Sequence, residues 1–202
     1  FIAPTMIGLM VLNIIPIFQT IHQSFYKTGD FGKGNKFVGL ANYEKVFGDT
    51  EVWQALWNTV KYAIIEVPIS IVIALVLAVF LNKKIKGRSA FRTIMFLPMI
   101  VAPAAVAMVW KWIYNSNFGL INNVFGTDVN WISNPQIAIY SIAVIGIWGV
   151  IGYNMVLFIA GLQEVPRDYY EAASLDGASG FKQFMYITVP LISPTIFFVL
   201  VT

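Results

Sequence analysis

Few side chains in this 202-residue sequence have the types and spacing that catalysis needs. His22 is the only histidine and has no evident acid or nucleophile partner, so a Ser–His–Asp triad is not indicated. The absence of cysteine excludes disulfides, iron–sulfur clusters and thiolate metal sites. The stretch Gly32-Lys33-Gly34-Asn35 departs from the phosphate-binding pattern G-x-x-x-x-G-K-[ST]. We therefore predict no catalytic residue, no metal ligand and no ATP hydrolysis by this chain.

Small and polar residues interrupt the apolar segment around residue 150. A polar group at membrane depth is costly and normally faces protein or a water-filled cavity. Aromatic rings beside an amide suit a carbohydrate, which makes this segment a candidate translocation pathway. Helix packing is the alternative, because Gly149 and Gly152 would let neighbouring helices approach closely. The candidate residues are Trp148, Gly149, Gly152, Tyr153 and Asn154.

Glu66 is an acidic residue inside another apolar segment, two residues before Pro68. An intramembrane carboxylate is by default a hypothesis for a functional site. Its position near the end of the segment favours instead a side chain that reaches external water.

The polar stretch from residue 163 to 186 separates two apolar segments and predicts an exposed helix. Pro166 suits the first turn of a helix, where its missing N–H costs nothing. Asp168 and Glu171 suit the positive end of the helix dipole. Ala172 and Ala173 are strong helix formers and small enough for another surface to approach.

The same stretch predicts a turn and a second helix. Gly177, which lies between Asp176 and Ala178, can take the left-handed conformation that ends a helix. We expect a second short helix from near Ser179 to about Tyr186, with Pro190 closing the loop at the entry to the next apolar segment. Such a rigid helix–turn–helix can transmit displacement.

The elements that position these residues are membrane spans. Hydrophobic residues make up 58% of the chain and charged residues 11%, against about 25% charged residues in soluble domains. Apolar runs near the length that crosses a bilayer recur, and in lipid they must be helical. We expect spans at Phe1–Phe25, Val60–Leu81, Thr93–Tyr114 and Ile137–Leu162, a partial fifth from Thr188, kinks at Pro98 and Pro103, and a short interfacial helix at Glu51–Asn58.

Charged residues in the loops predict the orientation of the spans. The 83–92 loop holds five Lys or Arg residues, whereas the 115–136 loop holds none. Short basic loops stay in the cytoplasm. The 83–92 and 163–186 loops are therefore expected inside, and the 26–57 and 115–136 loops outside. The net charge of +3 is too small to indicate nucleic-acid binding.

The 171–190 segment closely resembles the EAA loop of permease subunits from binding-protein-dependent ABC importers. Glu171-Ala172-Ala173 is followed four residues after Ala173 by Gly177, and ten residues later Ile187-Thr188-Val189-Pro190 begins. Further matches point to the carbohydrate-type, MalF/MalG-like branch. They are Phe37–Tyr43, Asn58-Thr59, Phe91-Arg92, Phe96-Leu97-Pro98 and Phe118–Asn122.

This resemblance implies an all-α polytopic membrane protein with the ABC importer permease fold. Residues 1–202 would form a single transmembrane permease domain, truncated at both ends and covering about five of six spans. The cytoplasmic EAA coupling loop would be residues 163–186. Its docking residues would be Glu171, Ala172, Ala173, Asp176, Gly177, Ala178 and Pro190.

The resemblance also implies partners. Two ATPase subunits would bind ATP and Mg²⁺, so this chain itself holds no cofactor. A second permease subunit, usually a different chain, would complete the pathway through the lipid. An extracytoplasmic solute-binding protein would deliver a carbohydrate to loops Phe31–Asp49 and Asn115–Gln136. The location would be the prokaryotic cell membrane.

Other functions remain open at this stage. The solute could be a glycerol phosphate or a polyol, although the only basic residue near the outer end of the third span is Lys111. A membrane-embedded enzyme would need a polar catalytic cluster at membrane depth, and the sequence shows none. A passive channel or a membrane scaffold would need no ATPase dock. The EAA-like loop argues against these interpretations.

Overall fold

The computed structural model describes residues 2–27, 36–83 and 86–202. The Gly32–Asn35 stretch, part of the Phe31–Asp49 loop and Lys84 lie outside the described residues. The chain divides into two compact units, Phe1–Asn58 and Thr59–Thr202. The prediction of one domain over residues 1–202 stays a prediction.

The first unit is helical apart from a two-stranded ladder in which Tyr26 faces Phe37. The Asn42 side chain joins the ladder to the helices, because its Nδ2 donates to the carbonyls of Ser24 (2.7 Å) and Tyr26 (3.1 Å). In chain order the elements are α1 (Ala3–Leu9), the π-helix η1 (Met10–Ile14), α2 (Ile15–Ser24), β1 (Tyr26–Lys27), β2 (Lys36–Phe37) and α3 (Ala41–Gly48).

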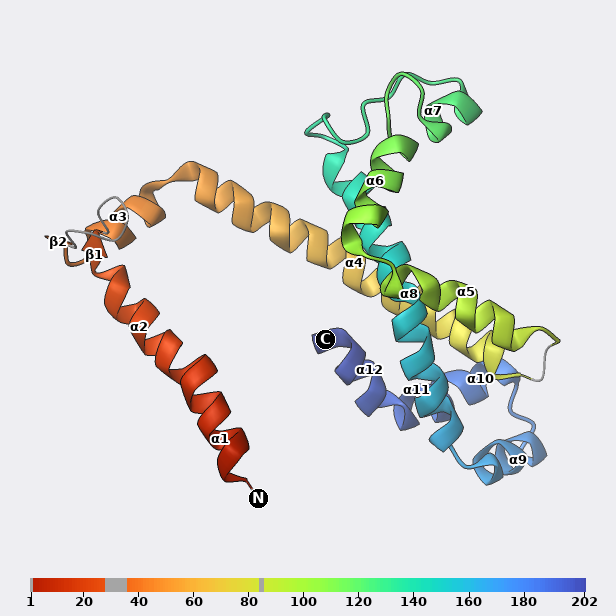
Figure 1. The fold of residues 1–202 in the computed structure, drawn as a ribbon. Helices are drawn as coiled ribbons and strands as arrows, with labels where there is room; N and C mark the ends of the chain where they lie inside the picture. The colour runs from red at the N-terminus through yellow and green to blue at the C-terminus, as the bar shows by residue number, and fades with distance from the viewer. Residues whose placement is uncertain (1, 28–35, 84–85) are drawn as a thin grey trace. The chain divides into compact units, whose positions relative to one another are not determined.

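In the described residues of the second unit all regular elements are helices, joined by turns and loops (Figure 1). Its first helix, α4 (Thr50–Asn82), begins in the first unit. The others are α5 (Arg88–Ile100), α6 (Pro103–Ile113), α7 (Leu120–Phe125), α8 (Ala138–Glu164), α9 (Arg167–Leu175), α10 (Gly180–Gln183), the π-helix η3 (Phe184–Thr188), α11 (Val189–Leu191) and α12 (Ser193–Val201).

Helix α8 is the centre of the second unit, and it contacts α5 and α12 (Figure 1). Gly152 lies against the backbone of α5, where a β-carbon would collide with the Met95 carbonyl. Gly161 lies against the Thr195 side chain of α12. Small residues at these points let helices approach closely, which is how helices associate in lipid.

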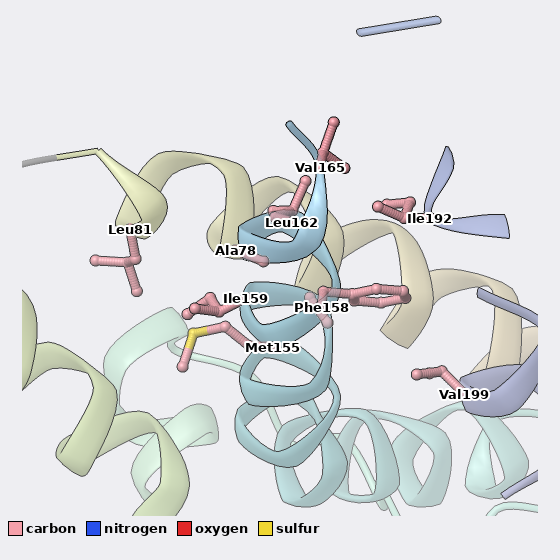
Figure 2. Packing of buried hydrophobic residues seen from close by; sticks show 10 residues of the cluster. Ala78, Leu81, Met155, Phe158, Ile159, Leu162, Val165, Ile192 and Val199 are labelled. Carbon is pink, nitrogen blue, oxygen red and sulfur yellow. The ribbon is translucent and has the colours of Figure 1, made fainter. Parts of the chain in front are cut away.

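The buried apolar core lies between the C-terminal half of α4, the C-terminal half of α8 and α12 (Figure 2). Phe158, Met155 and Ile192 are its largest fully buried side chains. Most other apolar residues are exposed in the isolated chain, as expected for a surface that contacts lipid or other subunits. The core members are Ala74, Ala78, Leu81, Met155, Phe158, Ile159, Leu162, Val165, Ile192 and Val199.

Prolines account for the irregular points of the helices. Pro103 forces Ala102 into an extended conformation (ψ 129°), so α5 and α6 meet at 98°. This break is far sharper than the predicted kink in a span over Thr93–Tyr114. Pro16 and Pro190 each lie two residues after the end of a π-helix. In a regular α-helix a proline ring would clash with the carbonyl four residues before it, and in both cases that carbonyl belongs to the π-helix.

The predicted spans correspond to three to five candidate spans whose bounds differ from the prediction. Three helices in the described ranges could cross a bilayer by length and composition, Ala3–Ser24, Thr50–Asn82 and Ala138–Glu164. Two bent pairs would raise the number to five, namely α5 with α6, and Gly180–Leu191 with α12. The separate interfacial helix at Glu51–Asn58 is wrong, because no helix-breaking residue follows it and the segment forms the first turns of α4.

Candidate functional site

The predicted coupling loop begins with α9, an exposed helix held at its N-terminal end. Val165 is buried in the core, and Pro166 is extended (ψ 137°) and occupies the N-cap position. The helix therefore starts at Arg167, one residue later than predicted. Asp168 lies in its first turn, where a carboxylate stabilises the positive end of the helix dipole.

The turn after α9 is a complete helix C-cap. Gly177 has a φ of +73°, which confirms the predicted left-handed residue. The amide of Ala178 donates to the carbonyl of Ala173 (2.9 Å), and that of Gly177 donates to Ser174 (3.1 Å). This six-to-one bond pattern is the Schellman motif, which satisfies the last carbonyls of the helix. The EAA alanines thus contribute backbone bonds as well as small side chains.

The second helix of the loop begins where predicted and runs further. Ser179 is its N-cap, and its Oγ accepts from the amide of Lys182 (3.4 Å). The predicted end at Tyr186 is wrong, because α10, η3 and α11 follow one another to Leu191. Pro190 therefore lies within this helix rather than closing the loop. The chain bends by 64° two residues later, at Ile192.

Side-chain hydrogen bonds tie α9 to the segment that follows it. The hydroxyls of Tyr170 and Thr188 share a bond of 2.9 Å, and Thr188 is buried. Gln183 donates from Nε2 to the Ser174 hydroxyl (3.0 Å) and to the Ala178 carbonyl (3.2 Å). Sequence reasoning missed these two side-chain pairs, because the order of residues along the chain does not show which side chains meet. The pairs are Tyr170 with Thr188 and Ser174 with Gln183.

The outer surface of the loop offers both polar and apolar contacts. Glu171, Ala172, Asp176 and Gly177 are exposed, whereas Ala173 and Ala178 are half-buried. Sequence reasoning missed a set of exposed apolar side chains, of which Leu175 is 91% exposed. The others are Tyr169, Phe181 and Tyr186. An exposed leucine beside small residues is a ready contact for an apolar groove on another protein.

One of the predicted pathway residues lines a cavity between α5, α6 and α8. This cavity has a volume of about 440 Å³, and its wall includes Trp148, Ile151, Pro98 and Trp110. The rings of Trp110 and Trp148 stand edge to face, with centroids 5.6 Å apart. The break between α5 and α6 creates the space, so the cavity follows from Pro103. Its lining residues are apolar or aromatic, which offers stacking surface and few hydrogen-bond partners.

The other four pathway candidates differ in their surroundings. Gly152 is buried against α5, which is the packing role that the sequence left open. Gly149 has open space where a β-carbon would be, so packing does not require a glycine there. Asn154 is buried and Tyr153 is half-buried in the isolated chain. A role of these residues in transport stays a prediction.

Glu66 lies at the contact between α4 and α8. A β-carbon at Gly146 would collide with the Tyr62 hydroxyl and come within 3.3 Å of the Glu66 Cγ. Tyr62 and Glu66 are one helical turn apart, and both are half-buried. The Glu66 side chain therefore packs beside α8, and the contact of its carboxylate with external water stays a prediction.

The predicted external loop between α6 and α8 has a defined centre. Asn122 is buried and donates from Nδ2 to the carbonyls of Ser116 (3.0 Å) and Val129 (2.9 Å). Its Oδ1 accepts from the Thr127 hydroxyl (3.0 Å) and from the Trp131 indole (2.8 Å). One side chain thus fixes four points of the loop. Phe125, on the same short helix α7, is exposed.

Metal ligands do not gather in the part of the chain that the structure describes. Residues 2–27, 36–83 and 86–202 contain no group of three or more His, Cys, Asp or Glu residues that could hold a metal ion. The absence of a cofactor from this chain stays a prediction.

This arrangement of apolar helices with an exposed, capped loop is that of an ABC importer permease. Residues 69–202 match the family described as "Binding-protein-dependent transport system inner membrane component". The chain belongs to this family, and the predictions of a multi-pass, all-α ABC permease are confirmed.

Named relatives support the assignment. The chain is 38% identical over 208 residues to the probable ABC transporter permease protein YesP of Bacillus subtilis, covering 100% of this chain and 66% of that protein. It is 34% identical to the trehalose/maltose transport system permease protein MalF of Thermococcus litoralis and 32% identical to the sn-glycerol-3-phosphate transport system permease protein UgpA of Salmonella typhimurium. Each of these two alignments covers 99% of this chain and 69% of the relative. The chain therefore spans about two thirds of the length of these relatives.

A solved structure has the same fold. It is that of a bacterial ABC transporter involved in the import of the acidic polysaccharide alginate, with a TM-score of 0.82 and 24% identity. The match covers 98% of this chain and 68% of that one.

Proposed function

We propose that this chain is a permease subunit of an ATP-driven, binding-protein-dependent importer for a carbohydrate. It would line the translocation pathway in a prokaryotic cell membrane and receive force from a separate ATPase, which binds ATP and Mg²⁺. The observation that carries this proposal is the capped, exposed segment from Glu171 to Gly177, followed at once by a helix that leads into the next span.

The roles of the loop residues follow from their exposure. Glu171 and Asp176 supply polar anchors, while Ala172 and Ala173 allow the ATPase surface to approach. Gly177 and Ala178 fix the angle of the turn through the C-cap bonds. Leu175 adds an apolar contact, and Pro190 shapes the helix through which displacement leaves the loop.

A carbohydrate is the solute class that the aromatic cavity supports best. The Trp110 and Trp148 rings offer faces on which a sugar ring can stack, and Tyr153 and Asn154 follow along α8. Two of the named relatives carry names for trehalose/maltose and sn-glycerol-3-phosphate transport. Among the described residues, the wall of the aromatic cavity holds no Lys or Arg that could bind a phosphate ester, which ranks a glycerol phosphate below a carbohydrate.

Two further partners complete the assembly. A second permease subunit would cover part of the exposed apolar helix surface. A solute-binding protein would dock on the external loops, where the four bonds of Asn122 support a fixed platform.

Capture of the ATPase subunit tests the proposal. The full-length chain, tagged and purified in mild detergent, is expected to bring the ATPase and the second permease with it. Gly177→Val should lower ATPase recovery about tenfold, since a β-branched residue with positive φ costs roughly 1–3 kcal/mol. Gly180→Val is the matched control, because nothing lies near its β-carbon and its φ is ordinary.

Either of two results would contradict the docking role. One is equal ATPase recovery with the parent chain and with Gly177→Val. The other is a chain that purifies without an ATPase in every nucleotide condition, which would favour a channel or a scaffold.

A further inference from the structure

The two ends of α9 are connected to the permease in different ways. At its N-terminal end, Val165 is buried in the core and Pro166 is extended, so a single stretch of backbone joins α9 to α8. At its C-terminal end, the Schellman cap and the bonds of Gln183 join α9 to α10. We therefore expect a force on α9 to be resisted at Val165 and to be transmitted to α10 through the C-cap and the Gln183 bonds.

A further, partly buried hydrogen bond joins α9 directly to η3. Tyr170 lies on the inner side of α9, half-buried against the core cluster, and its hydroxyl meets the hydroxyl of Thr188 at 2.9 Å. Thr188 is 5% exposed and is the last residue of the π-helix η3. The bond is partly buried, and the Thr188 hydroxyl also donates to the Gln183 carbonyl (3.5 Å), so breaking the bond costs free energy and couples the positions of the two residues.

A cavity lies beside the Tyr170–Thr188 hydrogen bond, so packing around the bond is incomplete on that side. The cavity has a volume of about 420 Å³, and its wall includes Val79 and Asn82 of α4, Leu162 of α8, Tyr170 and Thr188. This cavity leaves space between the Tyr170–Thr188 pair and parts of α4 and α8.

The helix on both sides of Thr188 is irregular. The π-helix η3 has a wider turn than an α-helix, and such turns are frequent at functional sites. The helix axis then bends by 64° between Leu191 and Ser193. In contrast, α8 is continuous and is held by the core and by the close contact of Gly152 with α5.

We propose that Tyr170 and Thr188 form a latch through which displacement of α9 is passed to α12, while α8 stays fixed. Tyr170 is a positioning residue that acts through Thr188, and neither residue needs to touch the ATPase. This inference rests on the proposed coupling of α9 to an ATPase and adds the route by which the motion leaves the loop.

The sequence lacks cysteine, which allows single-site labelling of this chain. The experiment uses the full-length chain in its complete transporter, in lipid nanodiscs, with any other cysteines of the complex replaced by serine. A nitroxide is placed in turn at Asp168→Cys on α9, Val156→Cys on α8 and Phe197→Cys on α12, all exposed positions. The spectral change on addition of ATP is then measured for each label.

In the parent transporter, ATP is expected to change the signals at residues 168 and 197 and to leave that at residue 156 nearly unchanged. In Tyr170→Phe the change at 168 should persist, and the change at 197 should fall about fivefold, as expected for loss of one partly buried hydrogen bond. Thr188→Val should have the same effect, and the double variant should be no worse than either single one. Thr188→Ser, which keeps the hydroxyl, should restore the parent response.

The matched control is Tyr140→Phe, which removes an exposed tyrosine hydroxyl on α8, outside the coupling loop, and should leave all three signals at the parent level. Thermal unfolding of each variant checks that the chain folds, and Tyr170→Phe keeps the ring that packs on the core. An undiminished response at residue 197 in Tyr170→Phe overturns the latch alone. The absence of any ATP response at residue 168 in the parent overturns the proposed coupling, and the latch with it.

Discussion

At the scale of single residues, the two glycines of the candidate pathway, Gly149 and Gly152, have different surroundings. Gly152 lies where α5 and α8 touch, and a side chain there would collide with the Met95 carbonyl. Gly149, three residues earlier, faces open space. The close contact with α5 explains the glycine at position 152. No neighbour in the structure requires a glycine at position 149, so Gly149 is the better candidate for a contact with solute.

Substitution by alanine separates these two roles. We expect Gly152→Ala to destabilise the full-length chain by about 1–3 kcal/mol, because the added methyl group overpacks the helix contact. Gly149→Ala should be neutral or stabilising by up to about 1 kcal/mol, since alanine favours the helix. Unfolding temperatures in mild detergent measure both changes. Equal shifts in the two variants would refute the packing explanation.

At the scale of elements, each proline acts according to the residues before it. Pro103 follows an extended Ala102 and breaks the third predicted span, and the cavity beside Trp148 is the result. Pro68 lies inside α4 and leaves it continuous. The external loop is ordered in another way, since Asn122 joins four partners within a short segment.

The Asn122 network predicts a local effect of mutation. In Asn122→Ala, the four hydrogen bonds of a buried side chain are lost, which should loosen residues 115–136 by about 1–3 kcal/mol. Amide hydrogen exchange of the full-length chain should therefore rise over this loop and stay unchanged in α9. Asn123→Ala, at the exposed neighbouring position, is the control. Similar exchange in the two variants would show that Asn122 does not hold the loop.

At the scale of the whole molecule, the distribution of basic residues predicts which loops lie on which side of the membrane. A single cysteine at Asn123 should react with a membrane-impermeant maleimide in intact cells. A cysteine at Lys182, in the coupling loop, should react only after the membrane is opened. Both positions are exposed, so access to the reagent depends on sidedness alone. The reverse labelling pattern would overturn the orientation and, with it, the contact between α9 and a cytoplasmic ATPase.

The sequence by itself determined the class of protein, the approximate spans and the coupling loop. These depend on local properties, namely runs of apolar residues, the left-handed conformation of Gly177 and the spacing from Glu171 to Pro190. Local patterns also predicted that α9 would end at Gly177, because the C-cap is made by residues close together in the chain.

Only the tertiary structure decided which residues meet across the chain. The contact of Gly152 with α5, the position of Glu66 against α8 and the bond between Tyr170 and Thr188 all join residues distant in sequence. The size of the bend at Pro103 was also undetermined, because a proline fixes where a helix stops, whereas the packing around it fixes the angle of the next helix. Helix packing in the membrane depends on the shapes of facing surfaces, and a one-dimensional pattern does not contain them.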